Sequence, residues 1–166
     1  MPAFRLCHQL DPRAMLECDV RSSKDGVVMI SHDAELERCT SGQGLIGEHD
    51  YVDLLKLDAG HNVSFDDGAT YPFRGRGHRL ATLEELLQEF PAARVSIDIK
   101  EHDVRFAEKV LELLRRYNAL HRVAVGSFSS EIVDYVRAQE PEVCIIMGMR
   151  ENIIFLLLQK LGLPGL

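Results

Sequence analysis

The sequence lacks the features that mark several large classes of protein. Its four cysteines form no CxxC pair and show no disulfide-dense spacing, which favours reduced thiols in a cytoplasmic protein. The longest purely apolar run, residues 153–158, is far too short to span a bilayer. The first ten residues lack the apolar core of a secretory signal. We therefore expect a soluble, cytoplasmic chain with no transmembrane segment.

Positive charge is also scarce. The 166 residues carry a net charge of −7 and the pI is near 5.5, which argues against nucleic acid as the main partner. A protein of this charge that handles phosphate needs local cations, either a metal ion or a few placed Lys and Arg side chains. The length favours one domain, residues 1–166, which is large enough to bury a real core. Nothing in the sequence indicates the oligomeric state.

The stretch from residue 17 to residue 33, ECDVRSSKDGVVMISHD, is the most informative part of the chain. Two short apolar runs flank an Asp-Gly pair, which predicts a turn between two strands. Because side chains alternate between the faces of a strand, Glu17 and Asp19 share one face of the first strand. Two carboxylates on an otherwise apolar strand are costly to bury without partners. The second run ends in His32-Asp33, so polar groups gather where each run stops, which indicates a site.

The rest of the chain alternates strands and helices after a glycine-rich, polar segment. Residues 34–81 show weak periodicity, which is typical of an inserted lid or binding loop, and a capping box from Thr82 to Glu85 then opens a helix that stops at Pro91. Strands that alternate with helices predict βα units and a parallel sheet. The expected strands are residues 14–20, 27–31, 94–99, 122–128 and 142–147, and the other expected helices are residues 3–10, 51–57, 104–117, 130–139 and 151–161.

Ionisable side chains fall toward the carboxyl ends of three expected strands. Asp98 and Lys100 share one face of VSIDIK, as Glu17 and Asp19 do in the first strand, and His32 ends the second strand. Active sites of parallel α/β proteins lie at this end of the strands. Three carboxylates without a soft ligand suit a hard cation, Mg²⁺ or Ca²⁺, better than zinc. His32 is then a candidate proton donor or acceptor near neutral pH.

Each of these signals also has a simpler interpretation. Glu17 and Asp19 also fit a solvated edge strand, and Asp98 with Lys100 also fits a structural ion pair. A strand followed by His-Asp is a common start of a turn or helix. The combination favours a site, because every one of these polar residues falls at the same end of its strand.

The motifs that carry these residues resemble a known family. LECDVRSSKDGVVMISHDAELERCTSGQG, LDAG, ATLEELL and VSIDIK are similar to the core signature of the glycerophosphodiester phosphodiesterase family, in the same order and at family-like spacing. The resemblance runs from Met1 to about Gly162. It implies an α/β fold, a TIM (β/α)8 barrel, with a segment inserted after the third strand, where residues 34–81 lie. It also implies hydrolysis of glycerophosphodiesters to glycerol 3-phosphate and an alcohol, with a divalent cation.

Residue by residue, the resemblance implies specific roles. Glu17 and Asp19 look like metal ligands, and His32 looks like the general acid for the leaving alkoxide. Asp98 stands where the family usually has a metal-binding Glu, so its carboxylate is one methylene shorter. Lys100 looks like a phosphate contact. The implied cofactor is a divalent cation, Mg²⁺ or Ca²⁺, and the implied partner is a small glycerophosphodiester or lysophospholipid substrate.

The sequence departs from the family pattern at both ends. The family begins with a strand that carries His-Arg-Gly, followed by Glu-Asn-Thr, and neither motif is present here. The absent His is the family's other acid/base residue, and the absent Glu is a metal ligand. At the far end the resemblance stops inside or just after the sixth βα unit. We therefore expect an incomplete barrel with strands two to six, as in a fragment, a truncated gene model or a splice-type product.

The leading hypothesis is metal-dependent hydrolysis of glycerophosphodiesters in lipid metabolism. The segment FDDGATYPFRGRGHR resembles family branches that accept lysophospholipids, which makes these lipids candidate substrates. The alternative is a catalytically inactive fragment or pseudoenzyme that binds a ligand or partner through the surviving surface. A carboxylate-pair glycosidase fits less well, because Glu17 and Asp19 lie on one strand instead of flanking a bond from two sides.

Overall fold

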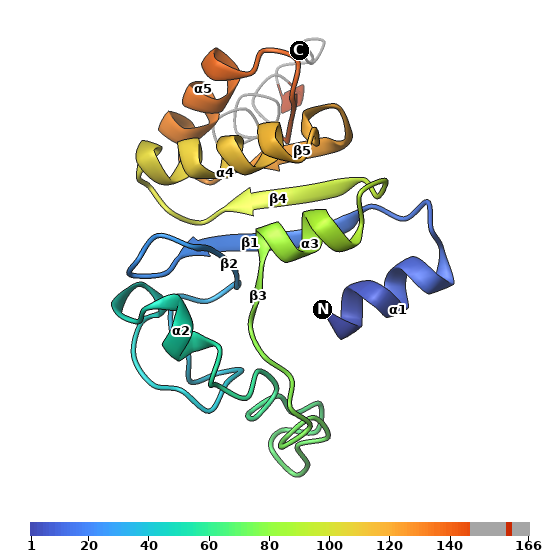
Figure 1. The fold of residues 1–166 in the computed structure, drawn as a ribbon, viewed down its shortest axis with the longest axis vertical. Coiled ribbons are helices and arrows are strands. Elements are labelled where there is room, and N and C mark those ends of the chain that lie inside the picture. Colours follow the sequence, from blue (N-terminus) through green and yellow to red (C-terminus); the bar gives the residue numbers. More distant parts are fainter. Residues whose placement is uncertain (147–158, 161–166) are drawn as a thin grey trace. The chain divides into compact units, whose positions relative to one another are not determined.

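The computed structural model describes residues 1–146 and 159–160, which form two compact units (Figure 1). Unit 1 comprises Met1 and residues 18–90, and unit 2 comprises residues 2–17 and the described residues from 91 onward. Strand β1 (Leu16–Ser22) begins in unit 2 and continues in unit 1. The assignment of the whole chain to one domain stays a prediction. None of the described helices combines the length and the apolarity that a bilayer crossing requires.

Unit 1 is built on an antiparallel hairpin between β1 and β2 (Val28–Ile30). The predicted turn is present, because Gly26 has a φ of +83° and its N–H donates to Ser23 O at 3.0 Å. β2 forms where the sequence predicts a strand, but it runs antiparallel to β1 and not as a parallel barrel strand. Residues 23–27 are too few for the crossover that a parallel pair requires. A short strand, β3 (Ala81–Thr82), pairs antiparallel with β2 and was not predicted.

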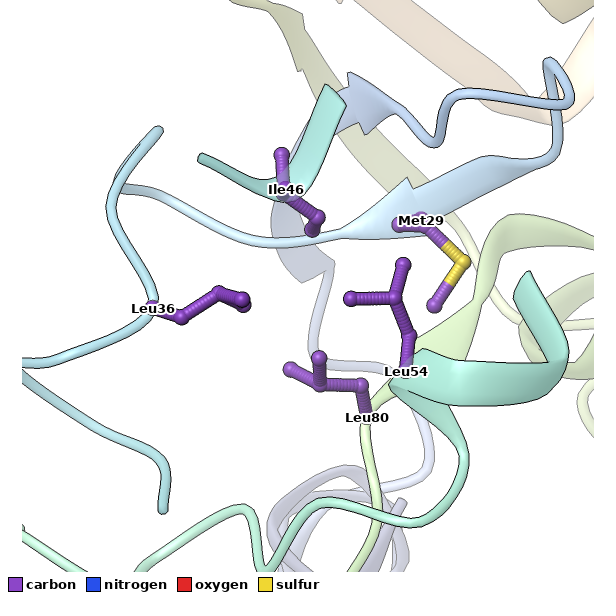
Figure 2. Packing of buried hydrophobic residues seen from close by; sticks show 5 residues of the cluster. All are labelled: Met29, Leu36, Ile46, Leu54 and Leu80. Atoms are coloured by element: carbon purple, nitrogen blue, oxygen red, sulfur yellow. The ribbon is translucent and has the colours of Figure 1, made fainter. Parts of the chain in front are cut away.

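Residues 34–80, called the cap segment from here on, are not a structureless loop. They contain η1 (Ile46–Glu48) and α2 (Tyr51–Leu54), which is shorter than the predicted helix at 51–57. A small apolar core holds the cap segment against β2 (Figure 2). Its members are at most 9% exposed and are Met29, Leu36, Ile46, Leu54 and Leu80. The cap segment therefore has a core of its own, called the cap core from here on, which is assembled from residues far apart in the sequence.

Helix α3 (Leu83–Glu89) begins at the predicted capping box. Glu85 N donates to Thr82 Oγ1 at 3.1 Å, and Thr82 N donates to Glu85 Oε2 at 3.0 Å. The leucine side chains of the helix are buried. The helix ends before Pro91, as the sequence predicts, because the residue before a proline is disfavoured in helical geometry.

Unit 2 follows the predicted alternation of strands and helices. Its elements are α1 (Pro2–Leu10), β4 (Val95–Ile99), α4 (Val104–Arg116), η2 (Leu120–Arg122), β5 (Val123–Gly126), α5 (Ser130–Gln139) and β6 (Cys144–Ile145). β4 pairs with β5 and β5 pairs with β6, both in parallel, and α4 and α5 lie side by side (Figure 1). The helix predicted at 151–161 lies outside the described residues, except for 159–160, which are helical.

The core of unit 2 comes from alternate strand residues and one face of each helix. β4 buries every second residue, beginning with Val95. Asp103 caps α4 by accepting from the N–H of Arg105 at 2.9 Å. The sequence predicts Ser129 or Ser130 as the cap of α5, and the structure has Ser129. The buried helix residues are Phe106, Ala107, Val110, Leu111 and Leu114 in α4 and Ile132, Val133 and Val136 in α5. Parallel strands that are each followed by a helix are the repeating unit of a (β/α)8 barrel.

Candidate active site

Strand β1 presents two carboxylates on one face. Leu16, Cys18 and Val20 are buried, whereas Glu17 is exposed and Asp19 is half-buried. This alternation confirms the predicted strand geometry, in which the two acidic side chains avoid the apolar core. Ser31 N donates to Asp19 O at 3.0 Å, so the ladder between β1 and β2 extends to the residue before His32. Asp19 and His32 are thereby held near each other within unit 1.

His32 follows β2 and is oriented by its neighbour in sequence. Its ring Nδ1 lies 2.7 Å from Asp33 Oδ1, and the ring is 65% exposed. Arg38 Nε in turn donates to the other carboxylate oxygen of Asp33. Arg21 Nε donates to the His32 carbonyl oxygen at 3.0 Å, which fixes the backbone as well. The imidazole is therefore held from its Nδ1 side.

The charge of Asp33 decides which ring nitrogen of His32 carries the proton. The hydrogen bond from Arg38, followed by that from His32, holds the pKa of the Asp33 carboxyl below its ordinary value. An ionised carboxylate accepts only, so Nδ1 must carry the hydrogen between the two residues. Nε2 is then the ring nitrogen that can exchange a proton with a bound molecule. Asp33 is not among the predicted site residues, although the His-Asp pair in the sequence was a signal for it.

β4 presents the second polar pair. Lys100 Nζ lies 2.6 Å from Asp98 Oδ2, and the side chains are 13% and 24% exposed. The ion pair that the simpler interpretation of this spacing predicts is thus present in the structure. Lys100 Nζ also lies 5.3 Å from the ring centroid of Phe128, which follows β5 and is 63% exposed. Sequence reasoning missed Phe128, since nothing in its pattern separates it from an ordinary strand residue.

The predicted site residues are brought together in pairs. Glu17 lies with Asp19 on β1, and Asp98 on β4 pairs with Lys100, which directly follows that strand. His32 and Asp19 belong to unit 1, whereas Asp98 and Lys100 belong to unit 2. A joint site of all five residues draws on both units and stays a prediction.

The donor chemistry of β1 suits a hard cation. Glu17 and Asp19 supply carboxylate oxygens, the ligands that Mg²⁺ and Ca²⁺ prefer, and neither is buried in the apolar core. Across residues 1–146 and 159–160, no three His, Cys, Asp or Glu side chains are already grouped to hold a metal ion. The ligand types therefore fit the predicted cation, and the set of three carboxylates with Asp98 stays a prediction.

The motifs around these side chains match a known family. Residues 11–152 match the sequence profile of the glycerophosphoryl diester phosphodiesterase family, which is most of the chain. The chain belongs to this family. It is 31% identical over 149 residues to the human protein named lysophospholipase D GDPD1, and the match covers 90% of this chain and 47% of that protein. The family predicted from the sequence is confirmed.

Solved structures of family members share the fold. A glycerophosphodiester phosphodiesterase from Agrobacterium tumefaciens is 32% identical, with a TM-score of 0.67 over 79% of this chain and 52% of that one. An Oleispira antarctica phosphodiesterase in complex with the product sn-glycerol-3-phosphate is 22% identical, with a TM-score of 0.72 over 98% of this chain and 65% of that one. The predicted fold class, a TIM barrel in part, is confirmed, and the chain spans about half the length of the curated relatives it matches.

Proposed function

We propose that the protein carrying this chain hydrolyses glycerophosphodiesters, with lysophospholipids among its substrates. Water adds to the phosphorus, the bond from phosphorus to the alcohol oxygen breaks, and a phosphomonoester and an alcohol result. Membership in the family supports this reaction, as does the human relative named lysophospholipase D. The product named with the Oleispira antarctica structure, sn-glycerol-3-phosphate, belongs to the same reaction class. The observation that carries the proposal is the orientation of the His32 ring, which is fixed by the contact of Nδ1 with Asp33.

His32 is the proposed general acid. Its Nδ1–H donates to Asp33 at 2.7 Å, so the doubly protonated ring would deliver its second proton from Nε2 to the departing alkoxide oxygen and keep the hydrogen on Nδ1. Asp33 is a positioning residue in this scheme, because it sets the tautomer and the angle of the ring without contacting the substrate. Arg38 keeps the Asp33 carboxylate ionised and in place. The high exposure of the His32 ring is consistent with a group that must meet a ligand.

Lys100 and the carboxylates handle the phosphate charge in this proposal. Glu17, Asp19 and Asp98 would hold a divalent cation, Mg²⁺ or Ca²⁺, which when bound neutralises charge on the phosphate. Lys100 donates to a phosphate oxygen from Nζ while its bond to Asp98 fixes the ammonium group. The shorter Asp98 side chain, compared with the Glu usual in the family, requires a small shift of this end of β4 or a bridging water.

The test is choline release from glycerophosphocholine and from lysophosphatidylcholine by the natural protein that carries this chain. His32→Ala should lower kcat by about 10²–10⁴-fold, the usual contribution of a general acid. Asp33→Asn should lower kcat by about 10–100-fold with KM unchanged, because the amide favours the wrong tautomer. His121→Ala, an exposed histidine in η2, is the matched control and should keep full activity.

The outcomes separate the parts of the proposal. Full activity of His32→Ala would remove His32 from the mechanism. Loss of activity with EDTA and recovery with Mg²⁺ or Ca²⁺ would support the cation, and EDTA-resistant turnover would contradict it. A protein that binds glycerol 3-phosphate but releases no choline from either substrate would favour the pseudoenzyme alternative.

A further inference from the structure

The cap segment ends in a loop that exposes aromatic side chains. We call residues 63–76 the tip loop, which is the green loop of unit 1 farthest from β1 and β2 in Figure 1. Phe65 is 79% exposed, and its ring meets the half-buried Phe73 edge-on at a centroid distance of 6.1 Å. Tyr71 is 36% exposed in the same loop. A single exposed aromatic residue is ordinary, but a group of three in one loop requires an explanation.

The exposure of these rings is built into the loop. Asp66 accepts hydrogen bonds from Ser64 Oγ at 2.8 Å, from Thr70 N at 2.8 Å and from Thr70 Oγ1 at 2.7 Å. These bonds close the turn that carries Phe65. The guanidinium of Arg74 stacks on the Tyr71 ring at 3.9 Å, which holds that ring in place. The loop is thus fixed with its aromatic side chains outward.

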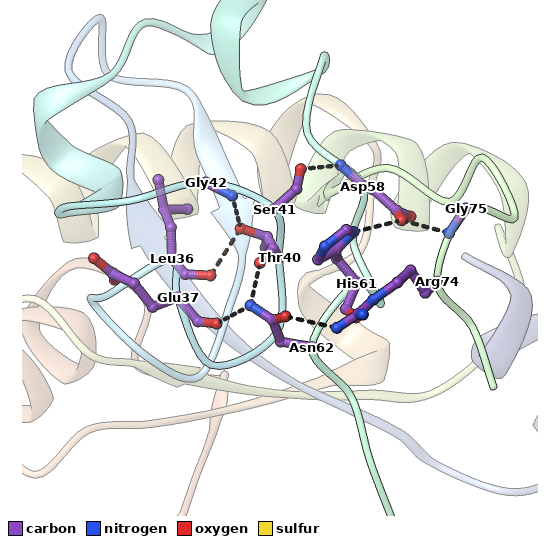
Figure 3. Close-up of polar contacts among 10 residues, drawn as sticks. All are labelled: Leu36, Glu37, Thr40, Ser41, Gly42, Asp58, His61, Asn62, Arg74 and Gly75. Carbon is purple, nitrogen blue, oxygen red and sulfur yellow. Dashed lines mark hydrogen bonds and ion pairs between the residues drawn. The ribbon is translucent and has the colours of Figure 1, made fainter. Parts of the chain in front are cut away.

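The base of the tip loop is tied to the rest of the cap segment (Figure 3). Asn62 Nδ2 donates to Glu37 O at 2.7 Å and to Thr40 O at 2.9 Å, and Asn62 Oδ1 accepts from Arg74 at 3.3 Å. Gly75 N donates to Asp58 Oδ2 at 2.7 Å on the other side of the base. Both ends of the tip loop are therefore anchored to the rest of the cap segment.

The same loop also carries an exposed cation, Arg76. Arg76 is exposed between Gly75 and Gly77, and a Cβ at either glycine would meet no atom within 4 Å. In the part of the chain that the structure describes, no carboxylate pairs with the Arg76 guanidinium. A guanidinium is well suited to bind phosphate through parallel N–H donors. Exposed rings and an exposed guanidinium in one loop match a surface that is apolar inside and phosphate-bearing outside.

We propose that the tip loop docks on a phospholipid surface. Phe65 and Tyr71 enter the boundary between headgroups and acyl chains, where aromatic residues are favoured, and Arg76 contacts headgroup phosphates. A stable protein–protein interface buries about 800 Å² on each partner, whereas docking on a bilayer needs only shallow insertion of about 5–10 Å, which a single loop can supply. The inference rests on the proposed function, because lysophospholipid substrates reside in such surfaces.

The test is sedimentation of the 166-residue chain with lipid vesicles. One vesicle contains phosphatidylcholine alone, and the other contains equal parts of phosphatidylcholine and phosphatidylserine. Phe65→Ser should lower the partition coefficient on both vesicles by about tenfold, since it removes one inserted ring. Arg76→Gln should lower it by about fivefold on the phosphatidylserine vesicles and by less on the neutral ones.

Two matched controls remove an equally exposed group elsewhere. Leu10→Ser removes an apolar side chain that is also 79% exposed, on α1, and Arg13→Gln removes an arginine whose side chain is 89% exposed. Both should partition like the wild type, and all four variants should keep the wild-type thermal midpoint. No binding to either vesicle, unchanged binding of Phe65→Ser, or an equal loss in Leu10→Ser would overturn the proposal. A partner protein that requires Phe65 while vesicles do not bind would overturn it as well.

Enzyme activity of the natural protein provides a second, independent test of the docking proposal. Phe65→Ser should leave choline release from soluble glycerophosphocholine unchanged and lower release from lysophosphatidylcholine held in vesicles. If the wild type binds vesicles but hydrolyses neither substrate, the proposed function fails and the docking inference stands. If it hydrolyses glycerophosphocholine but Phe65→Ser acts equally on both substrates, the docking inference fails and the function stands.

Discussion

Units 1 and 2 reach a defined structure by different means. Unit 2 buries regular apolar patterns: every second residue of β4 and one face each of α4 and α5. Unit 1 has short strands and a long cap segment with a core of five residues. Much of its irregular backbone is satisfied by side chains, as where Asn62 donates to Glu37 O and Thr40 O.

The difference shows how a long insertion can be ordered without regular elements. Backbone groups outside helices and strands need other partners, and short polar side chains can supply them. Thr40 illustrates this, because its Oγ1 donates to Leu36 O at 2.7 Å and accepts from Gly42 N at 2.9 Å. Each such bond is worth less than a buried leucine, so the cap segment should open more readily than the strands of unit 2.

Truncating a buried leucine in each unit should give the largest effect. Leu111→Ala in α4 should lower the free energy of unfolding by about 2–5 kcal/mol, because it leaves a cavity in a core that cannot collapse. Leu54→Ala removes the same atoms from the cap core, and both side chains are 0% exposed in the wild type. Urea denaturation measures the loss in each variant.

Hydrogen exchange sharpens this comparison. Leu54→Ala should speed amide exchange throughout residues 34–80 while β5 keeps its protection, because the small core can open locally. Leu111→Ala should lower protection in β4 and β5 together. Equal loss of protection across both units in Leu54→Ala would show that the cap segment does not open on its own.

The regular part of the fold could be predicted from sequence because its signals are local. The period of the apolar residues places β4 and α4 within one residue of their observed bounds. Residue type and position limit the predicted cap of α5 to Ser129 or Ser130, and Ser129 is the one observed. β3 has two residues, too few for any periodicity. The cap core joins residues such as Leu36 and Leu80, and no local pattern shows which distant residues meet.

In the candidate site, too, local features could be predicted from the sequence, whereas contacts between distant residues could not. Strand alternation predicts that Glu17 and Asp19 share a face, and the structure confirms it. The role of Asp33 depends on Arg38, which reaches it from a loop with no regular spacing. The spacing of Asp98 and Lys100 allowed two interpretations, a structural ion pair or part of an active site. The structure contains the ion pair, and the phosphate contact of Lys100 stays a proposal. Local geometry is thus readable in a sequence, whereas partner choice is not.

Removing the polar tie at the base of the tip loop should have an intermediate effect. Asn62→Ala should lower the free energy of unfolding by about 1–2 kcal/mol, since it leaves two carbonyl groups without their donor. Asn62→Asp is the matched variant, because it keeps the acceptor for Arg74 but loses both donated bonds. Wild-type stability in Asn62→Asp would mean that the Arg74 contact, and not the carbonyl contacts, holds the loop.

The smallest effect concerns pH and the capping box of α3. Burial raises the pKa of Glu85, but hydrogen bonds from Arg79 and from Thr82 N outweigh it, so the pKa lies below its ordinary value of 4.5. The ionised form is thus favoured in the folded state. Its stabilisation is complete well above pH 4.5 and is lost as the pH falls through the lower folded pKa. The free energy of unfolding should therefore decrease on acidification in this window.

Glu85→Gln tests that contribution directly. A glutamine can still accept from Thr82 N but brings no charge to Arg79, so the loss at neutral pH should be under about 1 kcal/mol. The urea midpoint of this variant should depend less steeply on pH below 4.5 than that of the wild type. Glu131→Gln, in the first turn of α5, is the matched control for the helix dipole alone. If both variants flatten the profile equally, the helix dipole accounts for the effect and the ion pair of Glu85 with Arg79 contributes nothing measurable.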